Sequence, residues 1–319
     1  MVYEGEASWP GGGPTTSSIA AVAVDLGAAV LLVGFAIAGV EDLRRREVSD
    51  RLWQAMGLLG FAIGLAALSP GGAVPLVAWS VVALLTLEHL VGWDLWLGPK
   101  WERHADRIEL AGYAGALLIV IALGARYGIG SNGLPWAAVA AMAVVLLARG
   151  LFELRVLYGA ADAKALMIAA VLLPVFPTPW LYSPTTATSA LAYLPFPISL
   201  LTNAALFSLV VPIYLALRNA GRGEFSLGDG FTGYSLPVRE LPDRFVWVRD
   251  PAVPETGHAD AETTEEDTEL RRRIARDLEG KGIDRVWVTP QVPLVAVMAA
   301  GAVAALLAGN VLLDLMLRI

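Results

Sequence analysis

The feature that most constrains this chain is a series of long apolar runs that hold few charged residues. A helix of about 20 apolar residues crosses the roughly 30 Å of hydrocarbon in a bilayer, and a core of a water-soluble protein has no need for such lengths. The runs therefore predict an all-α polytopic membrane protein. They number eight, which gives about eight transmembrane helices, at residues 19–40, 52–68, 74–91, 110–125, 135–148, 161–175, 198–217 and 292–317.

Composition supports this interpretation and excludes several classes of site. Of the 319 residues 56% are hydrophobic, and the mean hydropathy is +0.60. The absence of cysteine excludes disulfides, thiolate metal sites and thiol nucleophiles. The three histidines have no metal-ligand spacing, so we expect neither a metal nor a cofactor. A net charge of −7 gives no basic surface for nucleic acid.

The arginines are distributed unevenly between alternate loops. Arg44, Arg45, Arg46 and Arg51 fall on one side of the predicted bundle, and later basic residues such as Arg149 join them. Because basic loops stay in the cytoplasm, this asymmetry predicts a multi-pass protein of the cell membrane with both termini outside. Residues 1–18, rich in Gly, Pro, Ser and Thr, are predicted to form a flexible extracytoplasmic segment ahead of a membrane domain at residues 19–217.

A polar insert at residues 218–290 interrupts the hydrophobic pattern before the C-terminal span in residues 291–319. It holds a Gly-rich turn region, strand-like runs at 245–248 and 286–288, and a charged helical stretch at 268–278. We expect a small cytoplasmic α+β accessory domain, and a partly disordered acidic loop is the alternative.

Two acidic residues at the predicted cytoplasmic boundary are the candidate functional groups. Asp42 ends the first span and Asp162 opens the sixth. Two carboxylates close together in a medium of low dielectric constant resist double ionisation, so one tends to hold a proton. An aspartic protease needs this arrangement, in which one carboxylate takes a proton from water and the other polarises the scissile carbonyl. The simpler interpretation is that each Asp sets topology or pairs with an arginine.

Both segments resemble the signature motifs of the type IV prepilin peptidases, in particular the archaeal preflagellin and prepilin peptidase branch of the GxGD intramembrane aspartic proteases. The first motif is Asp42 followed by a basic stretch and then Val48, Ser49 and Asp50. The second runs from Gly159 to Asp162 and on through Ala163 to Lys164. Ala161 stands where the family name calls for a second glycine, and a requirement for positive φ there would be difficult for alanine to meet.

The resemblance implies a membrane aspartic endopeptidase with Asp42 and Asp162 as the catalytic pair. Gly159, Ala160, Ala161 and Lys164 would form the active-site loop, with Lys164 pairing with Asp162 or facing the lipid headgroups. The partners would be the lipid bilayer and precursors of pilins or archaellins, cut after a short basic leader at the cytoplasmic interface. Glu47 and Asp50 are candidates for contacts with that leader, or else pair with the neighbouring arginines.

The preference for Arg over Lys and the acidic stretch at 255–269 suggest adaptation to high salt, as in haloarchaeal members of the family. Two other classes remain open. A proton-coupled carrier could use the two acids as a relay, although carriers place ionisable groups near the midplane and often contain inverted repeats. A non-enzymatic membrane subunit would depend on the insert rather than on either aspartate.

Overall fold

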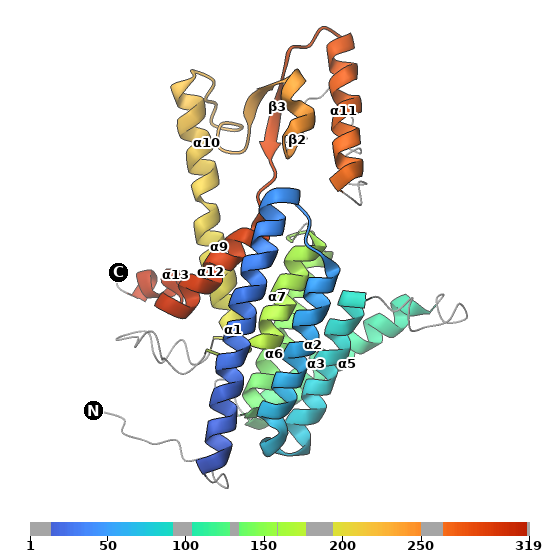
Figure 1. Cartoon of the computed structure of the whole chain (residues 1–319), viewed down its shortest axis with the longest axis vertical. Helices are drawn as coiled ribbons and strands as arrows, with labels where there is room; N and C mark the ends of the chain where they lie inside the picture. The colour runs from blue at the N-terminus through green and yellow to red at the C-terminus, as the bar shows by residue number, and fades with distance from the viewer. Residues whose placement is uncertain are drawn as a thin grey trace.

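The computed structural model describes residues 14–91, 104–127, 134–157, 159–176, 194–249 and 264–317, and the predicted N-terminal segment at 1–13 lies outside them. It is a helical bundle with a small sheet-containing unit at one end (Figure 1). In these ranges six helices are long and apolar enough to cross a membrane, or seven if one bent pair forms a single span. A membrane-embedded helical protein is therefore confirmed, and the count of eight spans stays a prediction.

The first part of the bundle follows the predicted runs with shifted ends. Its helices are α1 (Pro14–Arg45), α2 (Asp50–Leu68), α3 (Ala73–Val91), α5 (Ala105–Tyr127), α6 (Leu134–Glu153) and α7 (Ala160–Leu172), with a 3-10 turn, η1 (Ser69–Gly71), between α2 and α3. Helix α1 begins at Pro14, so the last residues of the predicted flexible segment are helical. Proline at the first position of a helix loses no hydrogen bond, which suits this start.

Helix α7 lies at the centre of the bundle. It packs against α1, α2, α3 and α6, and against two later helices, α9 (Phe196–Ser208) and α12 (Leu294–Ala308). Every side chain from Ala165 to Leu172 is buried. Thirteen residues of helix span only about 20 Å, which is less than the hydrocarbon thickness. The predicted sixth span is therefore a short helix surrounded by protein.

The later helices contain two breaks that the apolar runs did not predict. Helix α9 continues into α10 (Val210–Gly221) as one candidate span of 26 residues. Helix α12 is followed by α13 (Val311–Leu317) after a bend of 51°, so the helical run predicted at 292–317 contains a break, and whether it forms one span stays a prediction. Gly309 ends α12 with φ of 70°, and the Asn203 side chain on α9 donates to its carbonyl (2.9 Å) and accepts from the Val311 N–H (3.0 Å).

The insert folds around its own core at the end of the bundle where α1 ends (Figure 1). Its three strands are antiparallel in the order β1-β3-β2, and the 3-10 helix η3 and the helix α11 cover the sheet. The elements are β1 (Tyr234–Pro237), η3 (Val238–Asp243), β2 (Val246–Val248), α11 (Thr264–Gly280) and β3 (Arg285–Pro290). Two strands lie at the predicted runs, whereas β1, only four residues long and ending in proline, was not predicted. The described part of the insert is folded, which favours the accessory domain over the disordered loop.

Candidate active site

Asp42 lies in the last turn of α1, and its backbone takes part in the end of the helix. The Asp42 carbonyl accepts hydrogen bonds from the Arg46 backbone N–H (3.0 Å) and from Arg46 Nη1 (3.4 Å). Arg46 has φ of 57°, the left-handed conformation that commonly closes a helix. Because glycine more often occupies this position, an arginine here indicates that surrounding contacts hold the turn.

The Asp42 carboxylate is bound by the first turn of α12. The Ala296 N–H donates to Asp42 Oδ2 at 3.1 Å, and the Val295 N–H also acts on this carboxylate. Pro293, which precedes the helix, gives no side-chain cap, so Asp42 supplies from another helix the acceptor that an N-cap residue normally provides. Asp42 is 7% exposed, and Gly39 one turn earlier allows the close approach of α12, since a Cβ there would lie 3.2 Å from the Ala296 Cα.

Asp162 lies in the first turn of α7 and folds back on the residue that starts the helix. Its Oδ2 accepts a hydrogen bond from the Gly159 N–H at 3.3 Å. Gly159 adopts an extended conformation, and a Cβ at this position would lie 2.8 Å from Asp162 Oδ2. The glycine therefore leaves room for the carboxylate that packs against it, and positive φ plays no part.

The alanine that departs from the family motif fits the structure without strain. Ala161 is in the regular first turn of α7. Among the described residues the non-glycine positions with positive φ are Arg46 and Arg155. The backbone at Ala161 therefore does not need glycine. Ala160 beside it is exposed at the start of the helix.

The fold brings the two aspartates to the same end of the bundle. Helix α1 ends there, helix α7 begins there, and the two helices are in contact. Two acidic groups separated by 120 positions in the sequence thus lie on neighbouring helices at one edge of the apolar bundle.

A salt bridge connects the two motifs a second time. Lys164 Nζ lies 2.5 Å from Asp50 Oδ1, with the lysine side chain 13% exposed and the aspartate 60% exposed. Lys164 therefore pairs with Asp50, a partner that differs from the two considered from the sequence, Asp162 and the lipid headgroups. Asp50, a candidate contact for a leader, is paired with Lys164 at the surface, and Glu47 is exposed on the turn between α1 and α2.

A polar cluster between α3, α5 and α6 was not identified from the sequence. Arg149 forms ion pairs with Glu109 and with Glu153 (2.7 Å) and lies 3.0 Å from His89 Nδ1. The sequence contained a signal, because Arg149 and His89 both occur near the ends of apolar runs, but their partners come from separate helices.

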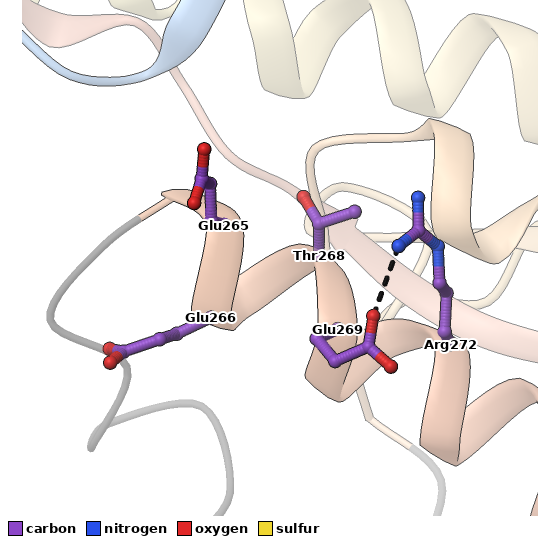
Figure 2. Close-up of a pocket in the computed structure, with 5 residues that line it drawn as sticks. All are labelled: Glu265, Glu266, Thr268, Glu269 and Arg272. Carbon is purple, nitrogen blue, oxygen red and sulfur yellow. Dashed lines mark hydrogen bonds and ion pairs between the residues drawn. The ribbon is translucent and has the colours of Figure 1, made fainter.

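The other candidate for a binding site is a shallow pocket on the insert. It is lined by Glu265, Glu266, Thr268, Glu269 and Arg272, all on α11, and Figure 2 shows Glu269 paired with Arg272 (3.0 Å) while Glu266 points away. This acidic helix face contains neither aspartate of the pair. Over the ranges that the structure describes, no group of three or more His, Asp or Glu residues is arranged to hold a metal ion.

The geometry can support acid–base chemistry on water. One carboxylate of a coupled pair can accept a proton from a water molecule while its neighbour donates a hydrogen bond to a carbonyl oxygen. No protein-family profile matches the chain, and no curated protein matches its sequence. The likeness to prepilin peptidases therefore rests on the two sequence motifs.

Proposed function

We propose that this chain is a membrane aspartic endopeptidase that removes the short basic leader of pilin-like or archaellin precursors, with Asp42 and Asp162 as the catalytic pair. The observation that supports the proposal is that α1 ends and α7 begins at the same end of the bundle, where the two packed helices carry Asp42 and Asp162. Two carboxyl groups that interact closely titrate as a pair, so a proton held there would belong to both. No cofactor is needed for such a reaction.

The surroundings of the pair favour a peptide substrate held at the membrane surface. A precursor with an apolar segment in the bilayer and a basic leader in the cytoplasm would present its scissile bond at the interface. Water reaches that depth, and non-helical backbone around Gly159 is tolerated where it lines a wet cavity. Glu47 and Asp50 are both exposed after Asp42 and stay the candidate contacts for a basic leader, although Asp50 also pairs with Lys164.

Coexpression with a tagged precursor tests the proposal. Asp42→Asn and Asp162→Asn should each slow processing by about 10²- to 10⁴-fold, the range for loss of a general acid or base. Asp25→Asn is the matched control, since Asp25 is an exposed aspartate in the same helix as Asp42. Unchanged processing in either active-site variant, at normal protein levels, would sink the assignment.

Orientation is a separate part of the proposal and has its own test. The arginine asymmetry predicts that the insert and the aspartate pair face the cytoplasm. A reporter that works only in the cytoplasm should therefore be active when it is placed within the insert. A signal from outside the cell would overturn the predicted topology.

A proton-coupled carrier is the alternative function. The broken pair α12 and α13 is the kind of discontinuous helix that carriers use. However, the side chains of Asn203 and Asn310 already form hydrogen bonds within the protein at this break. The two aspartates lie at one end of the bundle, whereas a carrier places its ionisable groups near the midplane. A carrier would be indicated by aspartate-dependent transport without cleavage of a precursor.

A further inference from the structure

Phe245 of the insert contacts the end of α1. The Phe245 ring, just before β2, lies under the Arg46 guanidinium, with 5.3 Å from Cζ to the ring centroid. Arg271 on α11 lies over the same ring at 5.7 Å. A guanidinium within about 6 Å of an aromatic ring is attracted to it. Arg46 also donates two hydrogen bonds to the Asp42 carbonyl, one from its backbone N–H and one from Nη1.

The insert also reaches the carboxylate of Asp42 through the chain that leaves the sheet. Three residues separate the end of β3 from the start of α12. The first of them, Gln291, donates its backbone N–H to the Phe245 carbonyl (2.9 Å) and its side-chain amide to Asp267 Oδ2 (3.2 Å). Gln291 thus fixes the point from which α12 starts, and the first turn of α12 donates to Asp42.

Both contacts converge on one catalytic candidate. One path runs from Phe245 through Arg46 to the Asp42 carbonyl, and the other runs from Gln291 through α12 to the Asp42 carboxylate. Asp42 is thereby held from two directions by residues more than 200 positions away in the sequence. Asp162 has a different kind of support, a local hydrogen bond from Gly159.

We infer that the insert is a positioning element of the active site, in which Phe245 and Gln291 hold Asp42 in line with Asp162. This inference rests on the proposed function for its effect on catalysis. It assigns a role to a segment that lies outside both sequence motifs. Neither residue need touch the substrate, because both act through Arg46 and α12.

The test uses the full chain in lipid nanodiscs with three variants, Phe245→Ala, Gln291→Ala and Phe245→Tyr. Positioning predicts that both alanine variants lower kcat about 10- to 100-fold, since misplacement of a catalytic group by about 1 Å costs about 10²-fold. KM should stay within about twofold, because the loss occurs in the transition state. Phe245→Tyr keeps the aromatic ring, so its kcat should stay close to that of the wild-type protein.

Hydrogen exchange at the first turn of α12 gives a readout that does not depend on cleavage. The Ala296 amide is protected by Asp42, so both alanine variants should speed its exchange by about tenfold or more if α12 shifts. Phe225→Ala is the matched control, since Phe225 is another phenylalanine of the insert and packs on Phe231. It should leave both kcat and this exchange rate unchanged.

The outcomes separate the inference from the proposed function. Unchanged exchange in Phe245→Ala and Gln291→Ala, or faster exchange with unchanged kcat, overturns the positioning role. A raised KM with unchanged kcat also overturns it and makes the insert a substrate-docking surface. If the wild-type protein cleaves no precursor, the proposed function fails, and the exchange rates alone then support or overturn the coupling of the insert to Asp42.

Discussion

Replacing Gly159 by alanine should separate the geometry of the site from the stability of the fold. The added Cβ would lie 2.8 Å from Asp162 Oδ2 and 3.3 Å from Cγ. Since carbon and oxygen atoms in contact normally stay about 3.5 Å apart, the carboxylate must retreat by about 0.7 Å. Asp162 ends in a freely rotating carboxylate, so it moves more readily than the helix that carries it.

The expected effect on the rate follows from that displacement. If misplacement of a catalytic group by 1 Å costs about 10²-fold, a displacement of about 0.7 Å costs about 25-fold in kcat. The fold should barely change. Gly159 has φ of −89° and ψ of 131°, which alanine adopts without strain. Loss of the bond from the Gly159 N–H costs about 1 kcal/mol, and the stiffer unfolded chain returns about half of it.

The assay is the initial rate of precursor cleavage by the purified protein, measured beside its thermal unfolding. Gly150→Ala is the control, because Gly150 lies in α6 with no atom within 4 Å of the added Cβ. That variant should cleave at the wild-type rate and unfold at a slightly higher temperature. A wild-type rate in Gly159→Ala would refute the idea that the position of the Asp162 carboxylate limits catalysis.

Three further predictions follow from contacts of the bundle. Lys164→Ala should lower the free energy of unfolding by only about 0.2–1 kcal/mol, because Asp50 in this pair is largely exposed, and chemical denaturation measures it. Gly39→Cys combined with Ala299→Cys should form a disulfide in this cysteine-free chain, since the Cβ positions lie 3.5 Å apart; absence of a gel shift under oxidation would contradict the packing of α1 on α12. Gly64→Ala should destabilise the protein by about 1–3 kcal/mol, because its Cβ would lie 2.1 Å from a ring carbon of Trp79, and a melting temperature equal to that of wild type would contradict this packing.

The sequence was most informative where lipid or a motif imposed a simple rule. Apolar runs located α2 and α3 within two residues at each end, because a spanning helix must satisfy its backbone internally. The motifs also located Asp42 and Asp162 at one end of the bundle, since a residue ending one helix and a residue opening another can share a depth. Gly159 was placed in the site by the motif, although its physical role, room for the Asp162 carboxylate, required coordinates.

What the sequence could not supply depends on contacts between distant backbone groups. Every residue except proline has a backbone N–H, so the apolar stretch around Ala296 does not reveal which N–H donates to Asp42. The pairing of Lys164 with Asp50 requires knowledge of which helices are neighbours. The bend at Gly309 is stabilised by Asn203 on α9, and hydropathy averages such single polar residues away.

The bond between Asp42 and Ala296 also sets an order of events during synthesis. The two residues are 254 positions apart, so at about 5–20 residues per second the ribosome needs roughly 10 to 50 s to add the second after the first. During that interval α1 and α7 are already made, while the acidic side chain that ends α1 has no donors from α12. The nascent bundle therefore holds both aspartates before it can orient the first of them, and a newly made chain should be inactive until its last helices have been inserted.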